Sequence, residues 1–314
     1  MILPEKSKLK ATMFTPFLVI VVFLLVCAVQ LLPDEVLGLT DNPYLAVVVI
    51  QLITYAVPSL FYYKLRGRNF SQKMRLRLFR PGTILFLVYA ALLLISGVFL
   101  LSILMYTVSP DAFVSDTAAG YASFAMNKRF FDGAYIVIAF AVLPAVTEEF
   151  LFRGIVIAEY ERFGALIAVI MSSSMFAMSH FSFARFPIYF FCGIVLSCVT
   201  FATRSVIAPM VIHTLNNAAV LLFEKYIIGI VDKHNVSVTL LLIILVGITI
   251  LSAMAMCFEA GSIYREMSDR NIQSEYAYGA DRKNGFFIRF SESFITPAFL
   301  LLVIIFIAAT LTEL

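Results

Sequence analysis

The chain has 314 residues, of which 61% are apolar and 14% are charged, and its mean hydropathy is +0.96. A soluble domain usually carries about a quarter charged residues, so a water-soluble globule is excluded. The net charge is only +3, which argues against a nucleic-acid-binding protein. The 31 Phe residues, with little Gly and Pro, exclude a disordered or collagen-like chain. This composition is typical of a polytopic helical membrane protein.

Nine apolar segments approach the length of about 20 residues that a membrane-spanning helix needs. They are too long and too uniformly apolar for β-barrel strands, in which apolar and polar residues alternate over about ten positions. We therefore predict an all-α, polytopic transmembrane helical bundle with eight or nine spans. In chain order, the predicted spans are roughly 13–32, 44–63, 82–107, 133–158, 164–182, 187–203, 205–230, 238–258 and 294–312.

Loop charges predict the orientation, because cytoplasmic loops of membrane proteins are rich in Lys and Arg. The first residues carry three lysines, and loop 64–81 carries seven Lys and Arg with no acid, whereas loop 33–43 carries three acids and no base. The N-terminus and loop 64–81 are therefore predicted to be cytoplasmic, and alternation adds 159–163 and 260–293 to that side. The basic loop favours contact with anionic lipid rather than with nucleic acid.

The N-terminus resembles a secretory signal, because lysines precede an apolar run. That run is long, however, and ends in Gln30-Leu31-Leu32-Pro33-Asp34 without a small-residue cleavage site. We therefore expect an uncleaved first helix. Together with the compact loops, this favours a multi-pass protein of a bacterial plasma membrane.

The chain is predicted to divide into three regions. Residues 1–132 form an N-terminal three-helix membrane region, 133–230 form a core, and 231–314 form C-terminal membrane helices around the cytoplasmic loop 260–293. His234 lies in a predicted outer loop and is expected to be solvated. The cysteines lie in apolar runs and are interpreted as small buried hydrophobes: Cys27, Cys192, Cys198 and Cys257.

The fourth predicted helix carries charges at membrane depth, where charges are costly and indicate function. Glu149 and Arg153 are four residues apart, so they share a helix face and can pair. Glu148 points about 100° away and has no partner on its own helix. A carboxylate in an apolar environment without a counter-charge suits general-base catalysis near neutral pH.

Two further predicted helices carry isolated polar residues. The fifth carries His180, with Phe176 one turn before it on the same face. The seventh carries His213 and Asn217, which are four residues apart and also share a face. At 1.5 Å per residue, Glu148, His213 and Asn217 lie about 12 to 18 Å from the inner ends of their spans, and His180 lies somewhat further out, at about 24 Å. A shared site near the middle of the membrane is compatible with these depths.

Each of these residues also has a structural explanation. An intramembrane His often serves as an interhelical hydrogen-bonding group. On the fourth helix, Glu149 and Arg153 would form an ion pair that only stabilises the fold, and Glu148 would be an additional acid without a catalytic role. A transporter would show repeated halves, and the apolar segments show no repeat. Three polar sets on separate helices within 70 residues favour one functional site.

The three sets together resemble the motifs of the CPBP family, which comprises CAAX prenyl endopeptidases and bacteriocin-processing and immunity (Abi-type) proteins. The pattern is Glu-Glu-x-x-x-Arg, then Phe-x-x-x-His, then His-x-x-x-Asn on successive membrane helices. Here it is complete and covers about 140–220, with these residues: Glu148, Glu149, Arg153, Phe176, His180, His213 and Asn217. The resemblance implies that 133–230 is a catalytic core.

The resemblance implies intramembrane peptide-bond hydrolysis by an activated water, with two possible mechanisms. In the metal-free one, Glu148 and His180 activate the water, His213 and Asn217 form the oxyanion hole, and Glu149 with Arg153 holds the helix. In the other, zinc is bound by Glu148, His180 and His213, with an open fourth position. We favour the metal-free mechanism, without cofactor, because Asn217 is a poor zinc ligand but a good oxyanion donor.

The expected function is therefore that of an intramembrane endopeptidase. Its expected partners are the lipid bilayer and a peptide or protein substrate with a membrane-proximal or lipidated tail. A non-catalytic membrane immunity or scaffold protein that uses the same polar residues as interhelical contacts is the alternative.

Overall fold

A computed structural model describes residues 10–33, 43–108, 130–232, 237–269 and 285–311, and every regular element in these ranges is a helix. The α-helices are α2 (Thr15–Gln30), α3 (Pro43–Gln51), α4 (Val57–Arg66), α5 (Arg68–Lys73), α6 (Ile84–Val108), α9 (Phe130–Val137), α10 (Leu143–Glu149), α11 (Ile157–Tyr160), α12 (Ala165–Met178), α13 (Phe186–Thr203), α14 (Ile207–Asp232), α15 (Ser237–Asp269), α16 (Phe286–Phe294) and α17 (Pro297–Leu311). Three wider π-helical turns interrupt two of the apolar helices: η2 (Leu52–Ala56) lies in Leu45–Arg66, and η4 (Ile138–Val142) and η5 (Phe150–Val156) lie in Gly133–Phe163.

Six helices in the described ranges are long and apolar enough to cross a membrane, and a seventh span is possible if α16 and α17 count as one. The six are Thr12–Val29, Leu45–Arg66, Pro81–Val108, Gly133–Phe163, Phe186–Thr203 and Val238–Asp269. The predicted all-α, polytopic membrane bundle is confirmed. The chain is a multi-pass membrane protein, although the predicted eight or nine spans exceed the number of long helices.

Two of the predicted spans, 164–182 and 294–312, contain helices that are shorter than predicted. The predicted span 164–182 is α12, whose 14 residues rise about 21 Å, less than the hydrocarbon thickness of about 30 Å. It ends at Met178, and Phe181, three residues later, adopts a left-handed backbone conformation with φ of 48°. The predicted span 205–230 corresponds to α14, Ile207–Asp232, in which Ile207–Phe223 is an apolar stretch. The predicted span 294–312 is α17, which meets α16 at a 60° bend.

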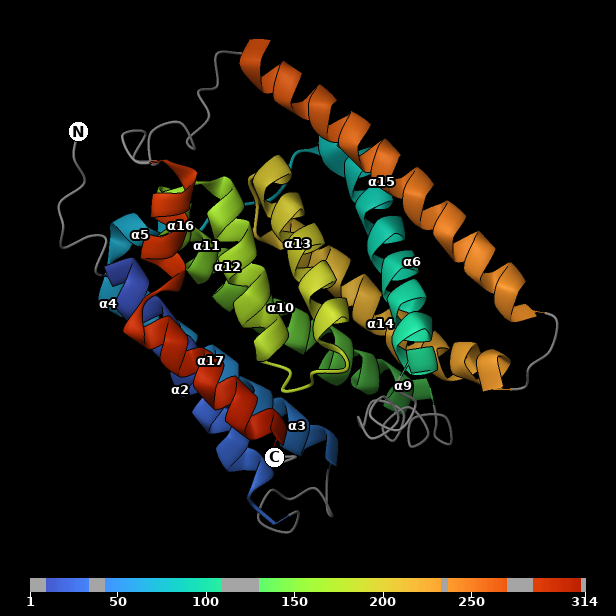
Figure 1. Cartoon of the computed structure of the whole chain (residues 1–314), viewed down its shortest axis with the longest axis horizontal. Coiled ribbons are helices and arrows are strands. Elements are labelled where there is room, and N and C mark those ends of the chain that lie inside the picture. The colour runs from blue at the N-terminus through green and yellow to red at the C-terminus, as the bar shows by residue number, and fades with distance from the viewer. Residues whose placement is uncertain (1–9, 34–42, 109–129, 233–236, 270–284, 312–314) are drawn as a thin grey trace.

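The helices are arranged around a central group formed by α10, α12, α13 and α14 (Figure 1). On one side, α6 packs against α13 and α14, and the long α15 lies along α6 at the edge of the molecule. On the other side, α17 lies beside α2, and α4 also packs against α2. The central helices are therefore covered on both sides by apolar helices.

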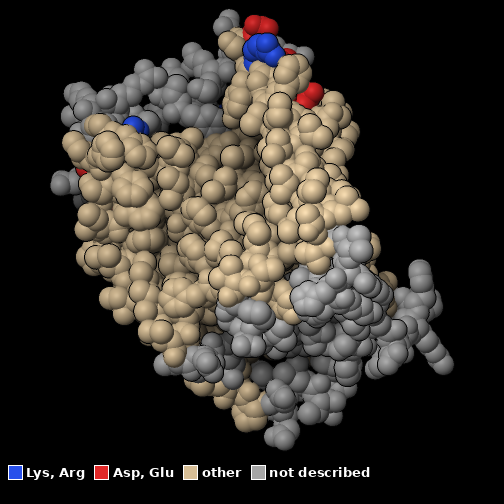
Figure 2. All heavy atoms as spheres, turned by 45° about the vertical axis from the view of Figure 1, so that its right-hand side comes forward, with Lys and Arg blue, Asp and Glu red and all other residues tan. Residues whose placement is uncertain are grey.

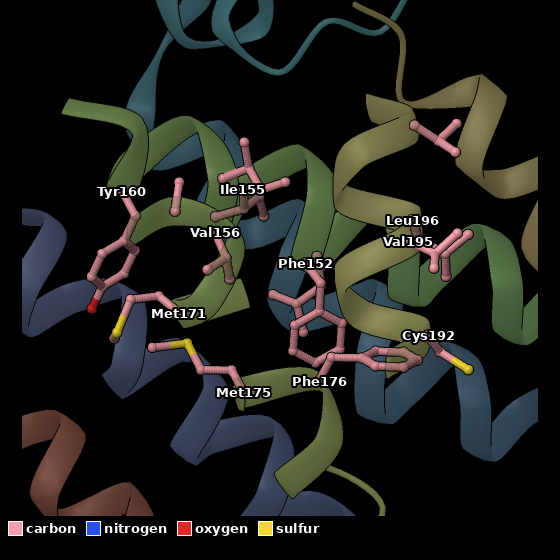
Figure 3. Packing of buried hydrophobic residues seen from close by; sticks show 14 of the residues in the cluster. Phe152, Ile155, Val156, Tyr160, Met171, Met175, Phe176, Cys192, Val195 and Leu196 are labelled. Atoms are coloured by element: carbon pink, nitrogen blue, oxygen red, sulfur yellow. The ribbon is translucent and has the colours of Figure 1, made fainter. Parts of the chain in front are cut away.

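One hydrophobic cluster joins residues of all three predicted regions, including Phe23, Phe152 and Phe306. In Figure 3, Phe152 and Phe176 lie side by side between the helices that carry Met175 and Cys192. Their rings meet edge to face at 5.3 Å. This packing fixes α12 against the span that carries the predicted acid residues. The division into three regions remains a prediction.

The visible face in Figure 2 is almost entirely uncharged, and Lys, Arg, Asp and Glu gather at one end of the molecule. Two cysteines lie on the apolar surface: Cys198 and Cys257 are exposed, whereas Cys192 is buried and Cys27 intermediate. The prediction of four buried cysteines was therefore wrong for two of them, because an apolar helix in a membrane also places apolar residues outward. His234 lies outside the described residues.

The segments with predicted cytoplasmic charges meet at one end of the bundle. Arg66 pairs with Glu159 at 2.5 Å, and Arg75 pairs with Glu161 at 2.5 Å. Arg289 Nη1 donates to the Phe163 carbonyl at 3.0 Å. Loop 64–81, the turn at 159–163 and part of 260–293 therefore lie together, as the charge pattern predicts. Glu159 is fully buried in this group and also accepts hydrogen bonds from Tyr62 and Arg162.

Glu159→Gln is expected to destabilise the protein by about 3 kcal/mol, because it removes the buried carboxylate charge that pairs with Arg66 and Arg162. Thermal unfolding in detergent, followed for the variant and for Glu259→Gln on the peripheral helix α15, measures this effect. Equal melting temperatures for the two variants would contradict it.

Candidate active site

The predicted site residues line one cavity of about 250 Å³. Glu148 enters it from α10, Phe176 from α12, and His213 and Asn217 from α14, while His180 comes from the turn between α12 and α13. The structure thus brings together the four residues that the sequence assigns to catalysis. Glu149 and Arg153 do not line the cavity but lie directly behind it.

Glu149 and Arg153 form a buried ion pair, as their spacing predicts. Arg153 Nη1 donates to Glu149 Oε1 at 2.8 Å, and the two side chains are 0% and 1% exposed. Arg153 also donates to the Gly193 carbonyl on α13 at 3.3 Å, and its guanidinium lies 4.5 Å from the centre of the Phe176 ring. The pair therefore connects the span Gly133–Phe163 to both α12 and α13.

The same carboxylate also holds His213. His213 Nδ1 lies 2.9 Å from Glu149 Oε1. A carboxylate only accepts hydrogen bonds, so Nδ1 must carry the proton in this contact. With the proton of the neutral ring on Nδ1, the Nε2 atom can donate a hydrogen bond only if the ring gains a second proton and becomes a cation. Sequence reasoning paired Glu149 with Arg153 alone and did not predict this contact, because the two residues are 64 positions apart.

His180 does not lie on a helix, contrary to the prediction. It follows the last residue of α12 by two positions, in a turn. Its Nδ1 lies 2.9 Å from the Phe176 carbonyl, an acceptor, so Nδ1 carries a proton and the neutral ring keeps a lone pair on Nε2. The ring stacks on Tyr189 of α13 with 3.6 Å between the centroids. These contacts fix the imidazole although it lies outside the helix.

The Phe176 ring lies between the two histidines. It meets His180 edge to face at 4.9 Å and His213 at 5.7 Å, and it is 1% exposed. It also contacts the guanidinium of Arg153. One aromatic side chain thus sets the spacing of both imidazoles, which gives the Phe of the second motif a physical role.

Glu148 is 8% exposed and has a partner that the sequence analysis missed. Gln51 Nε2, on α3, lies 3.4 Å from Glu148 Oε1 and donates to Thr147 Oγ1 at 2.9 Å. A glutamine within the apolar segment 44–63 is a signal that could have been followed, because polar residues at membrane depth are rare.

Other cavity residues were also not singled out by the sequence analysis: Arg185, Tyr189 and Asn216. Asn216 precedes the predicted Asn217, and both line the cavity. Asn217 Nδ2 contacts the Ala141 carbonyl of η4 at 3.5 Å, which is a long hydrogen bond. The second hydrogen on this nitrogen remains for another acceptor.

The zinc alternative requires that Glu148, His180 and His213 act together as ligands. Two imidazoles and a carboxylate are chemically suitable ligands. Across the ranges that the structure describes, however, no three His, Cys, Asp or Glu side chains are grouped so that they could hold a metal ion. The metal-free mechanism remains a prediction, with the zinc-dependent one as its alternative.

Comparison with known proteins places this site in a family. Residues 130–219 match the family described as type II CAAX prenyl endopeptidase Rce1-like. This segment of the chain is therefore similar to that family, in agreement with the resemblance of the three motifs to the CPBP family. The matched segment contains all three motifs and ends two residues after Asn217. It does not contain Gln51.

A curated protein is also similar to part of this chain. The membrane-embedded CAAX protease MroQ of Staphylococcus aureus (strain USA300) is 30% identical over 93 residues. The match covers 27% of this chain and 37% of MroQ. No solved structure matches the chain significantly.

Proposed function

We propose that the chain is an intramembrane endopeptidase that hydrolyses peptide bonds with a water activated by Glu148 and His180. The observation that carries this proposal is the convergence of Glu148, both imidazoles and Asn217 on one cavity inside an apolar bundle. The similarity of residues 130–219 to the Rce1-like endopeptidases supports the same activity.

In the proposed reaction, a water lies between Glu148 and the Nε2 lone pair of His180. Glu148 takes a proton from the water, and the water oxygen forms a bond to the carbonyl carbon of the scissile peptide. The proton then passes to the leaving nitrogen as the carbon–nitrogen bond breaks. The products are a carboxylic acid and an amine.

The oxyanion formed in this reaction is proposed to receive hydrogen bonds from His213 Nε2 and Asn217 Nδ2. His213 can donate from Nε2 only as a cation, since Nδ1 already donates to Glu149. With His213 as a cation and Glu148 as an anion, the formal charges of these two residues, Glu149 and Arg153 sum to zero. A neutral total is favourable for buried groups.

The proposed substrate is a peptide or protein whose cleaved tail is membrane-proximal or lipidated, in a bacterial plasma membrane. The description of MroQ as a membrane-embedded CAAX protease supports a CAAX-like tail. Crosslinking in native membranes to the Glu148→Gln variant, compared with the wild type, should trap the substrate. Recovery of no peptide or protein on the variant would argue against proteolysis.

Turnover is expected not to depend on zinc. Purified, active protein should contain well under one zinc per chain, and treatment with a chelator should leave the rate of peptide cleavage unchanged. Metal analysis of the same sample used for the assay measures both. One zinc per chain, with activity lost to the chelator and restored by added zinc, would replace the metal-free mechanism with the metal-dependent one.

A further inference from the structure

We propose that Gln51 is a positioning residue for Glu148, so that the second span, Leu45–Arg66, is part of the active site. This inference rests on the proposed function, because it assigns Gln51 a role in the same reaction. It goes beyond the family match, since Gln51 lies outside residues 130–219.

The contacts of Gln51 reach two neighbouring residues of α10. Its amide nitrogen lies 2.9 Å from Thr147 Oγ1 and 3.4 Å from Glu148 Oε1. The Thr147 hydroxyl is itself tied to its own helix, 3.0 Å from the Leu143 carbonyl and 3.2 Å from that of Pro144. The amide has two hydrogens, so it can donate to the fixed hydroxyl and to the carboxylate at the same time.

This arrangement restricts the carboxylate of Glu148. The anchored Thr147 hydroxyl holds the amide in place, and the amide then favours one orientation of Oε1. The hydrogen bond at Oε1 leaves Oε2 free to take the proton of a water in the cavity. A general base must lie within hydrogen-bonding reach of the proton that it removes, so an orientation fixed before the substrate binds favours turnover.

The same helix also supports the turn that carries His180. Tyr55, four residues after Gln51, is 7% exposed, and its hydroxyl interacts with Ser179. Ser179 Oγ in turn lies 3.4 Å from His180 Nδ1. The second span therefore contacts Glu148 directly through Gln51 and reaches Ser179, the neighbour of His180, through Tyr55.

The local backbone agrees with a functional role for this stretch. The π-helical turn η2 begins at Leu52, directly after Gln51, and Tyr55 lies within it. The π-helical turns η4 and η5 similarly lie before and after α10, which carries Glu148. Single π-helical turns inside α-helices occur frequently at functional sites. Gln51 and Glu148 are thus presented by two helices with the same irregularity.

A crosslinking experiment tests the placement of Gln51 without any assay of activity. Gln51→Cys and Thr147→Cys are combined in a full-length chain whose four native cysteines are replaced, and a short bifunctional thiol reagent is added in native membranes. We expect an intramolecular crosslink, detected by mass spectrometry. The pair Thr54→Cys and Thr147→Cys is the control and should link less. No difference between the pairs would overturn the inference.

Kinetics test the positioning role. Gln51→Met keeps the size of the side chain but removes its donors, and it should lower kcat by about 10- to 100-fold, as expected for the loss of a hydrogen bond to a charged group, with KM nearly unchanged. Gln51→Glu, which has the same shape and places a second carboxylate beside Glu148, should lower kcat at least as much. The matched control is Thr54→Val, because Thr54 is buried on the same span and its hydroxyl donates to its own backbone at Ile50.

The outcomes separate the two proposals. The positioning role would be overturned if Gln51→Met kept the wild-type kcat, or if Thr54→Val lost as much kcat as Gln51→Met. In either case the proposed function would still stand if the wild type cleaves peptide and Glu148→Gln does not. A change in KM alone would also overturn it, because a positioning residue for the base acts on turnover. A wild-type chain that cleaves no peptide would overturn the proposed function and this inference together.

Discussion

Glu148→Gln is expected to lower kcat for peptide cleavage by about 10⁴-fold, the upper range for removal of a general base. The substituted amide keeps the shape of the side chain and cannot accept the proton from water. The buried site keeps its folding contacts, because the ion pair behind it belongs to Glu149. Cleavage of a fluorogenic peptide by purified protein in lipid vesicles measures the rate.

The same experiment separates an enzyme from a scaffold. Membrane insertion and thermal unfolding of Glu148→Gln should match those of the wild type, and the control variant Glu259→Gln on α15 should cleave normally. If Glu148→Gln retained turnover, water activation by this carboxylate would be wrong. If its cellular function persisted without any turnover, the non-catalytic reading of the chain would gain support.

Loss of Glu149 is expected to damage both the fold and the reaction. Glu149→Gln leaves Arg153 buried without a counter-charge, which costs about 3 to 5 kcal/mol when one partner of a buried pair is removed. It also takes from His213 the carboxylate that fixes its ring. We therefore expect a lower melting temperature and a low yield of folded protein, with no cleavage by the fraction that folds.

A double variant distinguishes these two losses. Replacing a whole buried pair with apolar residues is often neutral for stability, so Glu149→Leu combined with Arg153→Met should recover much of the melting temperature. Cleavage should stay low, because His213 still lacks its acceptor. Recovery of both stability and cleavage in the double variant would show that the contact between Glu149 and His213 is dispensable. Thermal unfolding and the peptide assay on one preparation give both results.

The parts of the structure that the sequence predicted are local ones. Long apolar runs predict membrane helices because every residue in the run meets hydrocarbon or another helix. The contact between Glu149 and Arg153 follows from their spacing on one helix, since residues four apart face the same way. Neither prediction depends on how distant segments meet.

The errors lie where a helix ends or where two helices meet. The sequence around Ser179 and His180 contains no Gly or Pro, so nothing marked the end of α12 before His180. The π-helical turns leave the apolar pattern unchanged and were not predicted. Gln51 and His213 were not assigned to their partners because those partners lie 64 or more positions away in the chain.

The shared oxygen of Glu149 has a consequence for how members of this family lose activity over time. Since Oε1 accepts from Arg153 and also contacts His213, single substitutions at Glu149 or Arg153 are expected to lower the yield of folded protein, whereas substitutions at Glu148 are expected to leave a folded and inactive one. Related chains that survive as pseudoenzymes should therefore keep the second glutamate and the arginine of the first motif and vary at the first glutamate. On the proposed mechanism, Glu149 and Arg153 are then expected to indicate a folded chain, and Glu148 an active one.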